Sequence, residues 1–121
     1  MMRRAAEQDF DKILTPEIKQ GSVLSGAEWL IPFHNLSEVI ELATQHSIAV
    51  LGVEVFRVLS NGLGTEGYSG YEFKLDGNWA DFISQNNKCA SAYIDQHQFG
   101  EGYGYILTTT SKNEFAHLGI I

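Results

Sequence analysis

The segment Ile48 to Leu59 reads Ile-Ala-Val-Leu-Gly-Val-Glu-Val-Phe-Arg-Val-Leu and decides the fold of this chain. It is rich in β-branched residues, which favour strands over helices. Because side chains along a strand point alternately to opposite faces, one face carries Glu54 as its charged residue and the other carries Arg57. Both faces are otherwise apolar, which is typical of the middle of a sheet. The sequence therefore predicts a central strand over residues 48–59 that is covered on both sides.

The size and composition of the chain are those of an ordinary globular domain. It has 121 residues, of which 44% are hydrophobic and 19% are charged, values that suit one core and exclude a disordered protein. No apolar run approaches the roughly 20 residues that a membrane span needs, and the first residues lack the apolar stretch of a secretory signal. Cys89 is the single cysteine, so no internal disulfide forms. We expect one domain, residues 1–121, in the cytoplasm.

Acidic residues clearly outnumber basic ones. There are fifteen against eight, the formal net charge is −7, and no lysine or arginine lies between Gly21 and Phe56. Phosphate contacts need a basic face, so we do not expect nucleic acid as a direct partner. An acidic surface either serves solubility alone or draws in a basic protein partner by long-range attraction. The charge by itself leaves both interpretations open.

One amphipathic helix is predicted before the central strand in the sequence, and a second is predicted after it. Residues 36–45 carry apolar side chains at helical spacing and follow Asn35, which is a good N-cap. Residues 79–97 carry a longer apolar stripe and follow Asn78, a second good N-cap. A short helical turn is predicted after Thr15, where a proline stands at the first helical position. Each of the two longer helices thus has an apolar face to pack against a sheet.

Two further strands are predicted after the central one. Residues 71–75 and 103–110 alternate between apolar and polar side chains, as half-exposed strands do. The glycine-rich residues 60–70 are predicted to form a mobile hairpin loop, and residues 115–121 a last short strand or a docked tail. The order helix, strand, strand, helix, strand predicts an α+β fold, a single-domain two-layer sandwich with helices packed on a mainly antiparallel sheet.

The segment Gly62 to Gly67 reads Gly-Leu-Gly-Thr-Glu-Gly and matches the dinucleotide-binding fingerprint letter for letter. That motif requires a helix to begin at its end, so that the N–H groups of the helix meet the pyrophosphate. The residues that follow, Tyr68 to Leu75, have the pattern of a strand instead. We therefore favour a hairpin loop over a nucleotide site and expect no cofactor.

The sequence contains no recognisable catalytic or metal-binding set. The four histidines, at positions 34, 46, 97 and 117, do not stand at metal-ligand spacing from one another or from Cys89. Cys89 and His97 share a helix face but lie about 12 Å apart, too far for one metal or a thiolate–imidazole pair. Glu54 is the most notable acid, because its strand face is otherwise apolar. Such a carboxylate either belongs to a functional site, reaches the end of the sheet, or accepts hydrogen bonds from backbone N–H groups. We expect neither enzymatic activity nor a metal.

Five segments of the chain carry a family resemblance. They are the helix over residues 36–45, the run from Ile48 to Phe56, the aromatic strand from Tyr71 to Phe73, the helix from Trp79 to Ile94 and the strand from Tyr103 to Leu107. In order and character this set resembles the immunity protein 40 family of bacterial polymorphic-toxin systems. The resemblance implies a cytoplasmic protein without catalysis that binds a cognate toxin and neutralises it by occlusion in the producing cell.

A toxin-binding surface is predicted on the acids and aromatics of the central strand and the segment after it. Acids speed the encounter with a basic toxin domain, and aromatics anchor the complex. The expected partner is a basic toxin domain, with no nucleic acid and no membrane, and the chain is expected to be a monomer or a weak homodimer. The predicted toxin-binding residues are Glu54, Glu66, Tyr68, Tyr71, Glu72 and Asp76.

Two other classes of function stay open at this point. A small-molecule-binding or regulatory domain would place the glycine loop of residues 60–70 and Glu54 around an apolar pocket. An enzyme would need Glu54 beside a histidine in a cleft.

Overall fold

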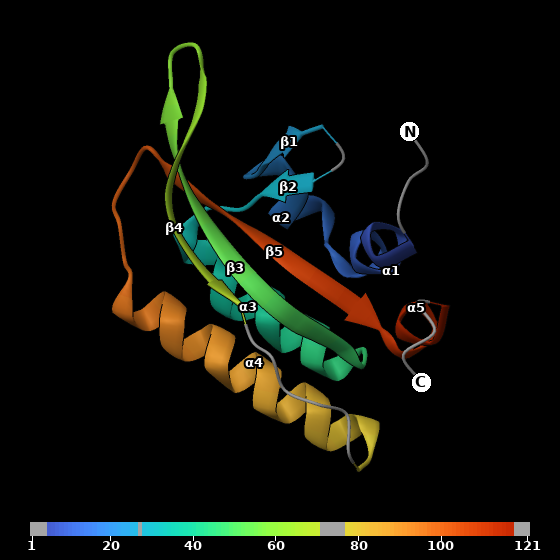
Figure 1. Cartoon of the computed structure of the whole chain (residues 1–121). Coiled ribbons are helices and arrows are strands. Elements are labelled where there is room, and N and C mark those ends of the chain that lie inside the picture. The colour runs from blue at the N-terminus through green and yellow to red at the C-terminus, as the bar shows by residue number, and fades with distance from the viewer. Residues whose placement is uncertain (1–4, 27, 71–76, 118–121) are drawn as a thin grey trace.

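The computed structural model describes residues 5–26, 28–70 and 77–117. In this part of the chain five helices pack with two antiparallel sheets, so the predicted α+β class is confirmed (Figure 1). The elements are α1 (Ala5–Ile13), α2 (Pro16–Gln20), β1 (Val23–Ser25), β2 (Glu28–Leu30), α3 (Phe33–Gln45), β3 (Ile48–Leu59), β4 (Gly62–Gly70), α4 (Trp79–Gln96), β5 (Tyr103–Ser111) and α5 (Lys112–His117).

The main sheet has three antiparallel strands in the order β4-β3-β5. The predicted central strand is therefore confirmed, with both of its bounds. Its predicted cover on both sides is found only in part, because Arg57 to Leu59 are exposed. The reason is that the β3–β4 hairpin runs on past the body of the domain, as Figure 1 shows at the top of the view.

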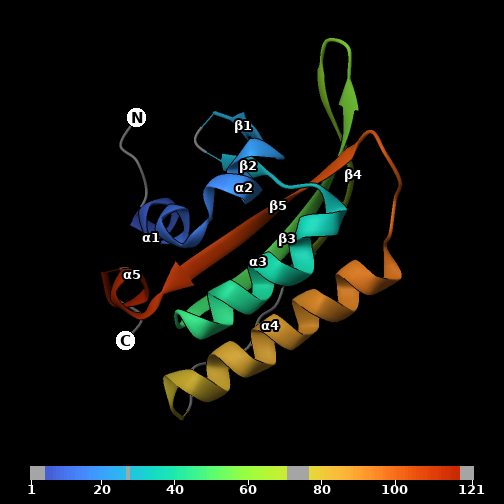
Figure 2. The same cartoon turned by 180° about the vertical axis from the view of Figure 1, so that it is seen from behind.

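Both long helices, α3 and α4, lie on the same face of the main sheet (Figure 2). Their apolar side chains meet those of β3 in one core. Val39 of α3, Ala90 of α4, and Val53 and Val55 of β3 are completely buried there. Phe10 of α1 belongs to the same core. Removal of this apolar surface from water is the main contribution that stabilises the two layers.

A bulge in β3 changes which of its side chains face the helices. The register with β5 shifts between Val50 and Gly52. Val50 before the shift and Val53 after it belong to the same core, whereas strict alternation would put them on opposite faces. The bulge therefore moves Glu54 to the face away from the helices, although the sequence pattern groups it with Val50. A second apolar cluster contains Ala49, Phe82, Ile83 and Phe115, with Leu51 and Trp79 packed against it.

A side chain closes the edge of β3 where β4 does not reach. Pairing with β4 begins at Gly52, so no strand among the described residues lies on this side of the backbone before that residue. Asn87 of α4 takes the place of a strand: its Oδ1 accepts a hydrogen bond from Val50 N at 2.7 Å, and its Nδ2 donates to Ile48 O at 3.1 Å. The same Nδ2 donates to Thr44 Oγ1 at 2.8 Å, which ties α4 to α3.

The outer edge of β5, at the opposite edge of the main sheet from β4, is bridged by backbone hydrogen bonds. Ile31, just after β2, exchanges two hydrogen bonds of 2.8 Å with Tyr105 of β5. Leu30 packs over Gly104 so closely that a Cβ on this glycine would lie 2.8 Å from Leu30 Cδ1. Only a glycine fits at position 104, because real Cβ atoms do not approach neighbours to this distance.

The two predicted helix starts have different outcomes. α4 begins as predicted, because Asn78 Oδ1 accepts a hydrogen bond from Asp81 N at 2.8 Å. The predicted cap of the earlier helix is wrong, since α3 begins at Phe33 and Pro32 is its N-cap. Asn35 lies inside the first turn. The proline holds an extended conformation that allows the helix to start before the asparagine.

Several segments differ from their predicted structure. Residues 62–70 are the strand β4 and not a mobile loop, because they pair with β3 after a turn at Ser60 and Asn61. Residues 112–117 are helical, so the strand that is one alternative for residues 115–121 is wrong for residues 115–117, and the rest of that range lies outside the described residues. The predicted strand over residues 71–75 lies outside the described residues. The short turn after Thr15 is confirmed as α2, whereas α1, β1 and β2 were not predicted.

Candidate binding surface

The sheet face opposite α3 and α4 carries the sequence-predicted residues of β3 and β4. Glu54 is paired in register with Tyr68 of β4 and with Ile106 of β5. Because alternate side chains share a face, Phe56 and Val58 follow Glu54 on this side, and Leu63 lies opposite Val58. We call this surface the open face; it consists of Glu54, Phe56, Val58, Leu63 and Tyr68.

Tyr68 lies along the surface of the sheet over two glycines. A Cβ on Gly52 would stand 3.2 Å from Tyr68 Oη, and a Cβ on Gly70 would stand 3.1 Å from its Cζ. The ring occupies the room that these missing side chains leave, an arrangement known to support glycines at sheet edges. The residue is nevertheless 64% exposed. It therefore presents an aromatic surface that is already held in place before a partner arrives.

Glu54 is half-buried beside this ring. No hydrogen bond or ion pair joins its carboxylate to another of the described residues, so the predicted alternative of a carboxylate bound to backbone N–H groups is not observed there. Directly opposed residues on neighbouring strands have Cβ atoms about 4.5–5.5 Å apart, so Glu54 and Tyr68 act as one surface. A carboxylate next to an aromatic ring suits a cation, above all the planar guanidinium of arginine.

Glu66 points to a different partner. The register of β4 with β3 shifts between Val55 and Phe56, and Glu66 is the extra residue of that bulge. Its Oε1 lies 3.9 Å from Arg57 Nε, in an exposed ion pair that contributes little to stability. The structure thus brings Glu54 and Tyr68 together and leaves Glu66 apart. The remaining predicted residues, Tyr71, Glu72 and Asp76, lie outside the described residues.

The hairpin tip carries exposed apolar residues. Leu63, in the predicted loop, is 37% exposed. Val58 and Leu59, in the strand that is predicted to be covered on both sides, are 48% and 42% exposed. They are missed because nothing in the local pattern of β3 signals where the cover of the sheet ends. Their position at the end of the segment, next to the turn at Ser60 and Asn61, is the one signal that could have found them.

The base of the hairpin is supported by the connection between α4 and β5. Val58 N donates a hydrogen bond to Gly102 O at 2.7 Å. That connection is fixed by Tyr105, whose hydroxyl donates to His97 O at 2.6 Å and accepts from Phe99 N at 3.3 Å. Burial raises the pKa of Tyr105, so this hydroxyl keeps its proton. The hairpin therefore projects from a fixed base.

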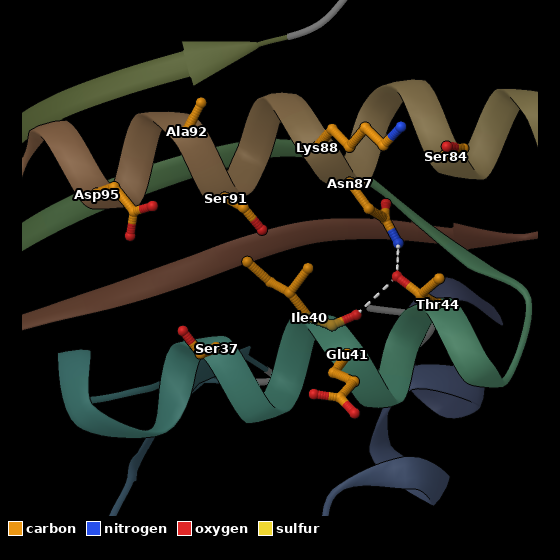
Figure 3. A pocket seen from close by; sticks show the side chains of 10 residues that line it. All are labelled: Ser37, Ile40, Glu41, Thr44, Ser84, Asn87, Lys88, Ser91, Ala92 and Asp95. Atoms are coloured by element: carbon orange, nitrogen blue, oxygen red, sulfur yellow. Dashed lines mark hydrogen bonds between the residues drawn. The ribbon is translucent and has the colours of Figure 1, made fainter.

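One of three hollows lined by described residues lies elsewhere, between α3 and α4, with a volume of about 580 Å³. Figure 3 shows Ile40 and Ser91 pointing toward one another across it, with Asn87 bonded to Thr44 at one end. Most of the residues that line it have polar side chains. The other two hollows have volumes of about 430 and 600 Å³. Glu54 lines none of the three, so an apolar pocket around it is not among them.

Asp9 and Glu114 are the two acids among the described residues whose pKa values are shifted. Ser111 joins them, since its Oγ donates to Asp9 Oδ2 at 2.6 Å and its N donates to Glu114 Oε1 at 2.7 Å. Hydrogen bonding to Ser111 lowers the pKa of Asp9, and burial raises that of Glu114. Because the pair links α1, β5 and α5 away from the open face, we assign it a structural role.

Among the described residues, no three His, Cys, Asp or Glu side chains come together in a way that could hold a metal ion. Within the same residues, no helix is long and apolar enough to cross a membrane. Comparison of the chain with protein-family models, with curated proteins and with solved structures gives no match. The resemblance to immunity proteins therefore stays a prediction from the sequence.

Proposed function

We propose that this chain is an immunity protein that binds a basic toxin domain and neutralises it by occlusion, without catalysis of its own. The observation that carries this proposal is the open face, where Glu54, whose carboxylate has no hydrogen bond or ion pair to another described residue, lies beside the exposed ring of Tyr68. A carboxylate and an aromatic ring held together are a ready site for a basic side chain of the toxin. The resemblance in the order of sequence segments supports the same function.

Recognition would proceed in two stages. The net charge of −7 attracts a basic domain from a distance and speeds the encounter. At contact, the basic side chain lies over Tyr68 and pairs with Glu54, while Val58 and Leu63 supply apolar contacts that exclude water. Occlusion needs only that the complex cover the working surface of the toxin. This function places the protein in the cytoplasm of the cell that makes the toxin, with a protein as its partner and no nucleic acid.

The test uses the protein encoded immediately upstream of this chain as the candidate toxin. Glu54→Gln combined with Tyr68→Ala should lower the affinity measured by calorimetry by about 100-fold, the usual loss when two central contacts are removed. It should also abolish the protection of growth when both proteins are co-expressed. Glu41→Gln, at an exposed position on α3, is the matched control for the loss of charge and should leave the affinity unchanged.

Two results would contradict the proposed function. The first is an unchanged affinity for the double variant, which would mean that the open face does not bind the toxin. The second is a chemical modification of the toxin by this chain, which would make it an enzyme.

The dependence of binding on salt is a further test. Raising the salt concentration from 50 to 500 mM, a range we choose to screen exposed charges, should lower the association rate more than it changes the dissociation rate.

A further inference from the structure

The outer edge of β4 is the one strand edge of the main sheet that the described residues leave uncovered. β3 is closed by β4, by β5 and by Asn87. The outer edge of β5 is bridged by Ile31 at Tyr105 and is packed against α1 and β2. Along β4, alternate N–H and C=O groups point away from β3, and no hydrogen bond joins them to another described residue. An open strand edge of this kind is a template for pairing with another chain.

The sequence of β4 does little to shield this edge. Proteins usually protect an edge strand with lysine, proline or a covering segment, and β4 contains neither lysine nor proline. Four of its nine residues are glycine, so much of its backbone has no side chain over it. The bulge at Glu66 is its one irregularity, and the Glu66 carboxylate there is directed to Arg57. A second strand can therefore approach the backbone on both sides of the bulge.

We propose that the partner binds by adding an extended segment to the outer edge of β4. This inference rests on the proposed function and specifies the form of the partner: a strand with basic and apolar side chains on the side of the open face. In such a pair the main chains supply the hydrogen bonds, and alternate side chains of the added strand lie beside Leu63, Thr65 and Tyr68. β4 offers a length of about 30 Å, which sets the length of the segment.

Charge favours a basic partner segment over a second copy of this chain. Each copy has a net charge of −7, so two copies repel one another as they approach. A second β4 would also bring its own Glu66 to the edge and would offer no cation to Glu54. A basic segment is attracted by the net negative charge and brings a cation that pairs with Glu54 on the open face, while its backbone completes the sheet.

The test is a nuclear magnetic resonance study of the complex with the upstream-encoded protein, with the two chains labelled differently. Strand addition predicts amide-to-amide contacts between the partner and residues 62–70, because paired strands lie about 4.8 Å apart. It also predicts slowed hydrogen exchange at the amides of β4. Thr65→Lys places a like charge on the exposed surface of β4 and should weaken binding at least 30-fold, whereas Val23→Lys on the equally exposed β1 should leave it unchanged.

The outcomes separate this inference from the proposed function. A complex that forms without contacts to β4 overturns strand addition and leaves the proposed function standing. The absence of any complex contradicts the proposed function and strand addition with it. If this chain alone sediments as a dimer with intermolecular contacts along β4, the occupant is a second copy and the basic-segment proposal is wrong.

Discussion

The two halves of β3 have the same apolar character and opposite surroundings. From Ile48 to Val55 the strand is largely buried, with β5 on one side, Asn87 and then β4 on the other, and two helices over one face. From Arg57 to Leu59 it is exposed and belongs to a projecting hairpin. The difference shows that an apolar strand makes core only as far as a second layer covers it. Past that point the same residue types form a surface suited to a partner.

The largest effect is expected from removing the side chain that closes the edge of the buried half. Asn87→Ala removes the partner of Val50 N–H and of Ile48 C=O, two groups of buried residues, and each such unpaired group costs about 1–3 kcal/mol. We expect the free energy of unfolding, measured with denaturant, to fall by about 3 kcal/mol. The amide of Val50 should also exchange its hydrogen faster.

Gln85→Ala is the matched control on the same helix, at an exposed position. It should change the free energy of unfolding by less than about 0.5 kcal/mol. If Asn87→Ala lowers the free energy of unfolding no more than this control does, the asparagine does not hold the edge of the buried half. The contact would then not explain why the two halves of β3 differ.

A direct comparison of the halves uses one residue type in one strand. Val53 is completely buried and Val58 is 48% exposed. Val53→Ala removes apolar contacts and leaves a cavity, so we expect a loss of about 2 kcal/mol in the free energy of unfolding. Val58→Ala should change it by less than about 0.5 kcal/mol. Under the proposed function the ranking reverses for toxin affinity, which Val58→Ala should lower and calorimetry would record. Equal losses of stability would show that the hairpin half is packed as firmly as the first.

Local sequence signals predict those parts of the fold whose cause is local. The bounds of β3 follow from its β-branched residues, and the start of α4 follows from Asn78, whose side chain caps the helix that it precedes. The bulge between Val50 and Gly52 depends on how β5 pairs with β3, a long-range contact that no local pattern contains. Because the bulge shifts the alternation of side chains by one residue, the sequence pattern alone assigns Glu54 to the wrong face of the sheet.

The sequence predicts which types of residue form the candidate site, but it does not predict how these residues are arranged in space. Glu54 and Tyr68 could be selected because acids and aromatics suit a basic partner. Their pairing depends on the short turn that sets the register of β4, a segment whose glycines indicate a loop. In β4 the strong pairing partner overrides the weak strand propensity of glycine. A loop over residues 60–70, which the glycines predict, has no strand edge, so the open edge of β4 does not follow from the sequence.

The smallest effect concerns the far end of the buried half, where Ile48 pairs with Ser111. Burial raises the pKa of Glu114 above its ordinary value of 4.5, so the folded state holds this proton more tightly than the unfolded state. Its contribution to stability is complete below pH 4.5 and is lost as the pH rises through the raised pKa. Asp9 acts in the opposite sense, because its lowered pKa gives a contribution that is present above pH 3.8 and lost in more acidic solution.

Glu114→Gln separates these two contributions. The amide cannot ionise, and its oxygen still accepts the hydrogen bond from Ser111 N. The variant should therefore match the wild type near pH 4 and become more stable than it as the pH rises to 7, by less than the loss expected for Val53→Ala. Thermal unfolding at half-unit steps of pH gives the difference directly, with Glu41→Gln as the exposed control for the change of charge. A difference that stays constant over this range would mean that Glu114 does not change its protonation there, and that the end of the buried half is held by packing alone.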